Sequence, residues 1–271
     1  MIKFSSTMTI QYDTVFSPYS AEEYLQALDW LSDSGFDGAE VCISHYRDLD
    51  LEGFRKELDA RGLLCSNIST GQARTLENIS LLHEGESMRK AQQRLKEHID
   101  AAKILDCKVT LGLLRGPGTP GNEEKEKAVV ARNLEPVIQY AEDRDVRMIL
   151  EAINRYETTL FTSAESTMSF IEKELGGADC LGVHWDLFHA NIEDADFEEA
   201  IERMGTRLMH VHLADSNRWF PGYGHLDFER VFRKLKQVDF DGFASFECFN
   251  LPSRETVIKE AGSLIAKLRS L

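Results

Sequence analysis

Short apolar runs alternate along the chain with longer segments in which apolar residues recur every three or four positions. The runs typical of strands lie at about 8–16, 38–43, 63–69, 107–114, 147–153, 181–188, 207–214 and 242–249. Helical periodicity marks the segments 21–31, 91–105, 128–141, 167–175, 231–235 and 257–268. Eight strands that alternate with helices predict a parallel sheet, and eight is the number of strands that closes a barrel.

Glycines mark several points where a helix would return to the sheet. Gly35 and Gly38 precede the second run, Gly62 precedes the third and Gly242 precedes the eighth, as expected where helices end at glycine. No linker rich in proline, glycine or serine divides the chain. We therefore predict one α/β domain, residues 1–271, with a (β/α)8 or TIM barrel fold, for which 271 residues are a typical length.

Charge and cysteine content narrow the class of protein. The chain has 46 acidic and 31 basic residues and a net charge of -15, so it would repel nucleic acids and anionic membrane surfaces. Its beginning is too polar for a signal peptide, and no apolar stretch reaches the roughly 18 residues of a membrane span. The five cysteines lack a C-x-x-C spacing, which favours free thiols in a reducing compartment. We expect a cytoplasmic protein without nucleic-acid or membrane partners.

The longest irregular stretch, 115–123 (R-G-P-G-T-P-G-N-E), follows the fourth predicted strand. Loops that follow strands form the catalytic face of such barrels, so we interpret it as a functional loop rather than a domain boundary. With Gly116 and Gly118, Arg115 could receive a phosphate or carboxylate at the distal end of a substrate. The alternative is an exposed loop arginine.

The last four predicted strands end in ionisable residues that an apolar core would not accept. A lone buried glutamate costs several kcal/mol unless it is paired, protonated or bound to a cation. Three carboxylates and one imidazole could hold a divalent ion and leave coordination positions open for substrate oxygens. We therefore predict a site for one divalent metal ion, Mn²⁺, Co²⁺ or Mg²⁺. Its expected ligands are Glu151, Asp186, His212 and Glu247.

Residues near these strand ends could also have a purely structural role instead of a role in the site. Considered alone, Glu151 or Glu247 could equally well be a structural acid at a strand end. His210 shares a face with His212 and is interpreted as a core histidine with its hydrogen bonds satisfied. His184 is expected to lie deeper than Asp186 and to support or pack against the site. Some aromatic residues could wall a sugar pocket or belong to the core: Tyr12, Phe16, Trp185, Trp219 and Phe249.

Four segments around the predicted ligands resemble a known superfamily. They are E-A-I-N-R-Y-E (151–157), H-W-D-L-F-H-A-N-I-E (184–193), H-V-H-L-A-D-S-N-R-W-F-P-G-Y-G-H-L-D-F (210–228) and S-F-E (245–247). Together they resemble the xylose-isomerase-like TIM barrel superfamily of sugar isomerases and epimerases. The likeness covers nearly the whole chain and is greatest to ketose 3-epimerases of the tagatose/psicose and keto-gluconate type.

The resemblance implies a role for each matching residue. It assigns the metal to Glu151, Asp186, His212 and Glu247, and substrate contacts to Glu157, His189 and Arg218. The implied reaction inverts C3 of a ketose or keto-sugar acid through a cis-enediolate, with Glu151 and Glu247 as acid and base. His189 and Arg218 would polarise O2, and Glu157 would accept hydrogen bonds from hydroxyls near O1. The alternatives are a helix cap for Glu157 and a surface salt bridge for Arg218.

Other functions are compatible with the same residues. An aldose–ketose or hydroxypyruvate isomerase of the superfamily would transfer the proton between C1 and C2 instead. A non-catalytic sugar-binding barrel would normally have lost one of its two acids, whereas Glu151 and Glu247 are both present. In each case we expect a small-molecule sugar as the partner, and the resemblance suggests a homodimer or homotetramer.

Overall fold

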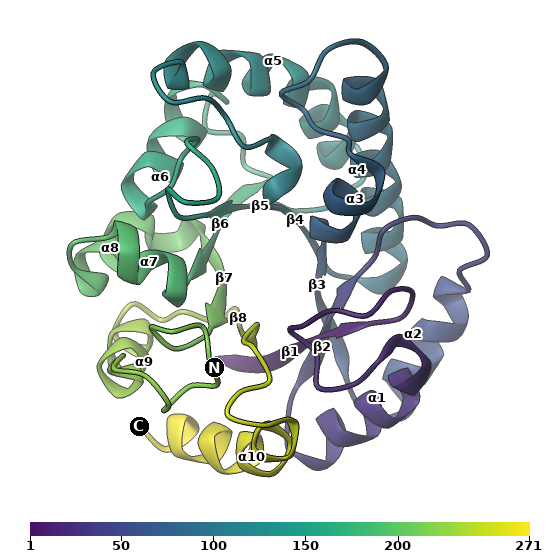
Figure 1. Cartoon of the computed structure of the whole chain (residues 1–271), viewed down its shortest axis with the longest axis vertical. Coiled ribbons are helices and arrows are strands. Elements are labelled where there is room, and N and C mark those ends of the chain that lie inside the picture. Colours follow the sequence, from purple (N-terminus) through teal and green to yellow (C-terminus); the bar gives the residue numbers. More distant parts are fainter.

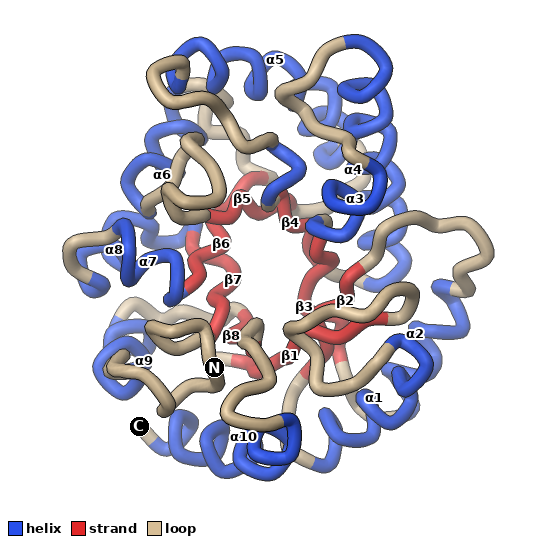
Figure 2. The backbone as a smooth tube through the Cα atoms, in the orientation of Figure 1, coloured by secondary structure: helices blue, strands red, loops and turns tan.

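The computed structural model describes residues 1–271 and contains eight parallel strands that form one closed barrel in sequence order. Figures 1 and 2 show the strands as an inner ring surrounded by helices. β1 pairs with both β2 and β8, which closes the ring. The predicted (β/α)8 barrel is therefore confirmed. The strands are β1 (Lys3–Thr9), β2 (Gly38–Cys42), β3 (Leu64–Ser69), β4 (Lys108–Leu111), β5 (Met148–Ala152), β6 (Leu181–Asp186), β7 (Leu208–Leu213) and β8 (Phe243–Phe246).

The first strand begins earlier than the sequence pattern predicts. The expected run was 8–16, but β1 covers Lys3–Thr9 and the chain beyond residue 9 forms a loop at the mouth of the barrel. In β1 three consecutive small polar residues separate the large apolar residues Phe4 and Met8, so the sequence pattern does not mark this segment as an apolar run. The aromatic and β-branched residues after it have strand propensity but lie in the loop.

Helices cover the outside of the ring, and the six predicted segments overlap α1, α4, α5, α6, α9 and α10. The helices α2, α3, α7 and α8 were not predicted individually, because each has ten residues or fewer and buries only one to three side chains. The helices are α1 (Tyr24–Asp33), α2 (Leu51–Ala60), α3 (Gly71–Glu77), α4 (Gly85–Leu105), α5 (Glu123–Glu142), α6 (Ala164–Lys173), α7 (Leu187–Glu193), α8 (Phe197–Met204), α9 (Phe228–Gln237) and α10 (Arg254–Ser270).

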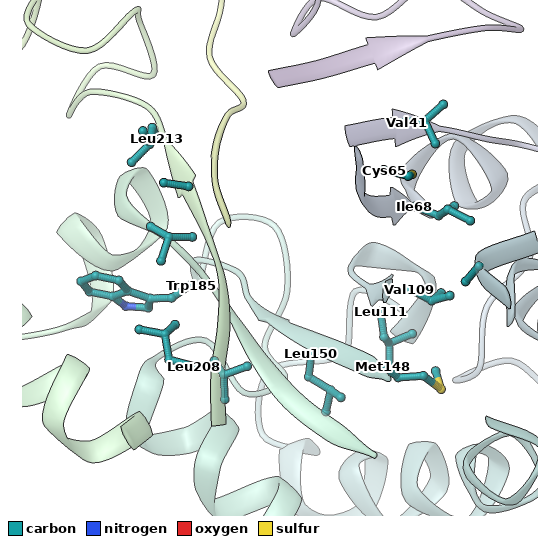
Figure 3. Packing of buried hydrophobic residues seen from close by; sticks show 14 of the residues in the cluster. Val41, Cys65, Ile68, Val109, Leu111, Met148, Leu150, Trp185, Leu208 and Leu213 are labelled. Carbon is teal, nitrogen blue, oxygen red and sulfur yellow. The ribbon is translucent and has the colours of Figure 1, made fainter. Parts of the chain in front are cut away.

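The main hydrophobic core lies between the strands and the helices. A cluster of 68 buried residues fills this layer, including Val41, Leu111, Leu150, Trp185 and Leu213 on the strands. Figure 3 shows these side chains along the strands. They occupy alternate strand positions, as expected for one face of a sheet. Burial in this layer therefore stabilises the barrel and leaves the opposite face of each strand free for other residues.

The interior of the barrel is unusually polar. TIM barrel interiors are usually filled by branched apolar side chains, but the alternate strand positions here include Asn67, Thr110, His184 and His210, all buried. Asn67 Nδ2 donates to Thr110 Oγ1, which lies 3.2 Å from His184 Nδ1. The His184 and His210 rings meet edge to face with centroids 4.7 Å apart. Polar groups at this depth need hydrogen bonds or an ion to balance their burial.

Two further features complete the description of the chain. All five cysteines are free thiols, and Cys42, Cys65 and Cys248 are buried. None of the helices has both the length and the apolar surface that a membrane crossing requires.

Candidate active site

The four predicted metal ligands converge at the carboxyl ends of the last four strands. Glu151 lies in β5, Asp186 ends β6, His212 lies in β7 and Glu247 directly follows β8. One candidate ligand atom from each lies within 4.8 Å of all the others. The register explains part of this convergence, because Asp186 pairs with His212 across β6 and β7. The structure therefore contains a group of acids and a histidine, largely buried, that could hold a metal ion.

The unused atoms of this cluster fit a divalent cation. Asp186 caps α7 through Oδ1, which accepts the backbone N–H groups of Phe188 and His189 at 2.7 and 3.1 Å. Asp186 Oδ2 and His212 Nδ1 are buried without a hydrogen-bond partner. They lie 3.5 Å apart, and His212 Nδ1 is 3.2 Å from Glu247 Oε2. Buried polar atoms rarely lack partners, and a bound cation would satisfy both of these.

The electrostatics of the cluster also indicate a place for positive charge. Burial and the negative charge of Glu247 raise the pKa of Glu151 to about 8. Burial opposes the charge of His212, but Glu40 and Glu247 raise its pKa well above the usual value. The carboxylate of Glu151 fits at this place because residue 112 is a glycine. A Cβ atom on Gly112 would lie only 2.7 Å from Glu151 Oε2. The site therefore concentrates negative charge that a divalent cation would neutralise.

His189 lies beside the cluster in a hydrogen-bonded chain. Its Nε2 is 3.8 Å from Glu151 Oε1, and its Nδ1 is 2.6 Å from Asn154 Nδ2. Asn154 Nδ2 also lies 3.2 Å from Glu157 Oε1. Burial lowers the pKa of His189, which favours the neutral imidazole. With Nδ1 accepting from Asn154, the Nε2–H group is available to a substrate oxygen.

Arg218 closes the other side of the site. Its guanidinium lies 3.3 Å from Glu157 Oε1 and 3.2 Å from Glu247 Oε2, and it lies between the rings of Phe16 and Phe188. The backbone of Arg218 has φ 62°, a left-handed conformation that is uncommon outside glycine. Strain of this kind is concentrated at functional sites. The surface salt bridge considered for Arg218 does not describe this largely buried side chain.

A cavity of about 310 Å³ lies at the mouth of the barrel, and its lining includes Glu151, Glu157, His189, His212, Arg218 and Glu247. The loop after β1 contributes Tyr12 and Phe16, two of the aromatic residues considered as pocket walls. Trp185 instead lies in the outer core, where its Nε1 donates to Asp194. The size suits a small ligand. The remaining wall is rich in hydroxyl and amide groups, from Thr14, Ser69, Thr70, Gln72 and Thr75.

The interpretation of Arg115 as a substrate contact does not agree with its position. Arg115 is fully buried, outside the lining of the cavity, at the end of a 3₁₀ turn (Leu113–Arg115). Its guanidinium donates to the carbonyls of Gly112 and Leu160 at 3.0 and 3.1 Å, and also to those of Leu111 and Glu151. Phe161 stacks on it. With these donors occupied, Arg115 joins the loop to β5 instead of receiving a phosphate or carboxylate.

Two residues that the sequence did not single out complete the site. Asn154 contacts His189, as described above, and Glu40 lies beneath His212 within 3.0 Å of its Nε2. Glu40 is also the partner of His210, whose Nε2 lies 2.7 Å away. His210 is therefore buried as expected, but only its Nε2 is paired, because its buried Nδ1 has no hydrogen-bond partner. A carboxylate in the middle of the apolar strand G-A-E-V-C was the available signal, but it lies before the strand end.

Residues 28–268 match the family model of the xylose isomerase-like TIM barrel, and the chain belongs to that family. It is 31% identical over 242 residues to the L-ribulose 3-epimerase of Mesorhizobium japonicum, covering 87% of this chain and 79% of that protein. Identity to the D-psicose 3-epimerase of Enterocloster bolteae is 27% over 256 residues, covering 89% and 82%. A solved structure of L-ribulose 3-epimerase superposes with a TM-score of 0.84 at 25% identity, covering 100% of this chain and 95% of that one.

These similarities define the class of the enzyme. The named relatives are epimerases, which are isomerases that act on sugars. The predicted membership of the superfamily and the predicted isomerase class are therefore confirmed. The relatives support a sugar epimerase for this chain.

Proposed function

We propose that the protein is a divalent-metal-dependent ketose 3-epimerase that inverts C3 of a small sugar. The main support is the pair Glu151 and Glu247, whose carboxylates face one cavity beside an arginine and a neutral histidine. Epimerisation removes a proton next to a carbonyl and returns one to the opposite face, so it requires two such groups. The names of the similar proteins, L-ribulose 3-epimerase and D-psicose 3-epimerase, support C3 as the reacting carbon.

In this proposal the ion is held by Glu151, Asp186, His212 and Glu247, a set of hard oxygens and one imidazole that suits Mn²⁺, Co²⁺ or Mg²⁺. When bound, it would supply Lewis-acid stabilisation of the negative charge that develops on the substrate oxygen. The unpartnered Asp186 Oδ2 and His212 Nδ1 support this assignment.

Glu151 and Glu247 would move the proton at C3 from opposite faces of the sugar. Without the ion, burial and the charge of Glu247 raise the pKa of Glu151 to about 8. A bound cation would lower this pKa and favour the ionised carboxylate, which can accept the proton. Arg218 contacts Glu247 at 3.2 Å and would fix the direction of that carboxylate. Which residue acts first depends on the configuration of the substrate at C3.

The remaining residues would bind and polarise the sugar. The Nε2–H of His189 and the guanidinium of Arg218 would donate to the carbonyl oxygen O2, where negative charge develops. Glu157, which contacts Arg218 and lies 4.0 Å from His189 Nδ1, would accept hydrogen bonds from hydroxyls near O1. The burial of His189 and Arg218 limits the access of water, which strengthens the interactions that these two residues would make.

The cavity favours an uncharged ketose over a ketose phosphate or a keto-acid. Arg218 is the only lysine or arginine in its lining, and it is already paired with Glu157 and Glu247. Asp13 adds a further acid near the loop after β1. Hydroxyl and amide side chains are suited to hydrogen bonds with sugar hydroxyls.

Proton exchange at C3 tests the proposal. Purified protein loaded with Mn²⁺ is incubated in D₂O with free ketoses, ketose phosphates and keto-acids, and NMR follows deuterium uptake and epimer formation. We expect uptake at C3 that falls at least 100-fold in Glu151→Gln and in Glu247→Gln, because each loses its acid–base group. Glu124→Gln, a change at an exposed residue of α5, serves as the control and should exchange normally.

Other outcomes would contradict the proposal in different ways. Exchange at C1 or C2 instead of C3 would identify an aldose–ketose isomerase. Sugar binding without exchange at any carbon, in protein that retains its metal, would identify a sugar-binding barrel. Exchange that survives complete removal of the metal with EDTA would exclude the metal-dependent mechanism.

A further inference from the structure

Glu40 is a buried carboxylate in the barrel interior, below the candidate metal centre. It comes from β2, whereas the two imidazoles that approach it come from β7, across the barrel from β2. His212 Nε2 lies 3.0 Å from both Glu40 oxygens, and His210 Nε2 lies 2.7 Å from Oε2. Glu40 and both histidines are at most 1% exposed. An ionised carboxylate at this depth requires several donors.

The contacts of Glu40 determine its orientation. Its Oε1 accepts from Asn67 Nδ2 at 3.3 Å and from the Ser69 hydroxyl, both on the neighbouring strand β3. Its Oε2 faces His210. The register between β2 and β3 also shifts between Ala39 and Glu40, an irregularity of the kind that redirects a side chain. Donors on two strands therefore hold the carboxylate against His212.

The position of Glu40 also determines which nitrogen of His212 is free. An ionised carboxylate can only accept, so the His212 nitrogen that faces Glu40, Nε2, must carry a proton. In the neutral ring the other nitrogen, Nδ1, then has a lone pair. Nδ1 is the atom that points to Asp186 and Glu247 and has no hydrogen-bond partner. In His212, Nε2 therefore faces Glu40, and Nδ1 faces the candidate metal centre.

We propose that Glu40 is a positioning residue for the metal centre: it holds the His212 ring and fixes its proton on Nε2, so that Nδ1 is presented to the ion. This inference rests on the proposed function, because it requires the metal site assigned there. Partners that accept the second N–H of a ligating histidine orient the ring, and their loss typically weakens metal binding about 10- to 100-fold.

Calorimetric titration of metal-free protein with Mn²⁺ tests the proposal without relying on turnover. Glu40→Gln keeps the shape of the side chain but replaces one acceptor oxygen with a donor, and Glu40→Asp keeps the charge but withdraws it from His212. We expect both variants to bind Mn²⁺ about 10- to 100-fold more weakly than the wild type. Saturating Mn²⁺ should restore most of the kcat of Glu40→Asp, because the acid–base pair is intact.

The matched control removes a partly buried hydrogen bond between two residues outside the candidate metal site. Tyr46 Oη lies 2.6 Å from Nδ1 of His98 on α4, so Tyr46→Phe destabilises the protein without touching His212. Urea unfolding measures the loss of stability in each variant. We expect Tyr46→Phe to leave the Mn²⁺ affinity within twofold of the wild type.

Several outcomes would overturn the inference. If Glu40→Asp binds Mn²⁺ as tightly as the wild type, Glu40 does not position the ligand. The same holds if Tyr46→Phe weakens binding as much as Glu40→Asp does, since the effect would then follow general stability. Should Glu40→Gln fail to fold, Glu40→Asp decides the question. Absence of Mn²⁺ binding by the wild type would instead overturn the metal centre of the proposed function.

Discussion

The side chain of Asn154 lies between the backbone N–H of Tyr156 and the His189 ring, and it determines which nitrogen of that ring carries the proton. Its Oδ1 accepts the N–H of Tyr156 at 2.9 Å, which fixes the orientation of the side-chain amide. Nδ2 must then be the atom that faces His189 Nδ1 at 2.6 Å, so that Nδ1 accepts and the ring proton is on Nε2. Nε2 lies on the side of Glu151, in the cavity. A local turn therefore leaves the Nε2–H group of His189 free to donate to a ligand in the cavity.

Replacing Asn154 with aspartate should reverse this arrangement. The carboxylate can still accept from Tyr156, but it can only accept from His189, so the ring proton moves to Nδ1 or the ring becomes charged. Loss of a donor aimed at developing negative charge costs about 100-fold in kcat, and we expect a decrease of that order in steady-state kinetics. In His189→Ala the same aspartate should have little further effect, because both residues act through one imidazole. An unchanged kcat in Asn154→Asp would contradict the role of Asn154.

Most of the candidate site could be predicted from the sequence, because strand ends and family resemblance both mark it. Glu151, Asp186, His212 and Glu247 are polar residues at the ends of apolar strands, and the structure brings them together. Glu40 could not be found in this way, since its two histidine partners come from a strand across the barrel and only closure reveals them. Asn154 likewise depends on a turn whose geometry the sequence does not specify.

Among the secondary structure elements, the turn after β4 is joined to β5 by one buried arginine. Arg115 donates to backbone carbonyls of Leu111 and Gly112 before it and of Glu151 and Leu160 after it. Backbone carbonyls at this depth cannot be hydrogen-bonded by water, so the guanidinium supplies donors that would otherwise be missing. The Gly112 carbonyl also accepts the backbone N–H of Arg115 at 3.2 Å. Because Glu151 is a proposed catalytic residue, its hydrogen bond to Arg115 connects the turn after β4 to the candidate active site.

Arg115→Met should therefore destabilise the fold. We expect the free energy of unfolding in urea to fall by about 3–5 kcal/mol, since several buried carbonyls lose their donors. Arg233→Met is the matched control: its side chain is 56% exposed and paired with Glu229, which is 36% exposed, and such surface pairs contribute about 1 kcal/mol or less. If Arg115 bound the anionic end of a substrate instead, Arg115→Met would raise KM and leave the unfolding transition unchanged.

Element boundaries could be predicted where periodicity and burial agree. Each of the strands β2 to β8 overlaps its predicted run, because most of these segments are rich in apolar residues and the last four lead to predicted metal ligands. β1 differs because its inward positions are small and polar, Ser5 and Thr7, in keeping with the polar interior of this barrel. The short helix α7 starts at Leu187, directly after Asp186, whose carboxylate caps it, and its apolar pattern is too brief to detect.

For the whole molecule, the excess of acidic residues bears on the choice of substrate. The net charge of -15 repels anions at long range, and inside the cavity Asp13 and Glu157 add negative charge near the one arginine. A ketose phosphate would bring about two further negative charges into this field. A free ketose would bring none and would lose no electrostatic energy on approach.

A ketose and its phosphate ester, compared under the same conditions, provide the test of this argument. At about 0.05 M ionic strength we expect kcat/KM for the free ketose to exceed that for the phosphate at least tenfold. Raising the ionic strength to about 0.5 M should increase kcat/KM for the phosphate through screening and leave that for the free ketose within twofold. Asp13→Asn should favour the phosphate more than Asp29→Asn does, because both remove one charge but only Asp13 lines the cavity. A phosphate that reacts faster than the free ketose at low salt would contradict the assignment of an uncharged substrate.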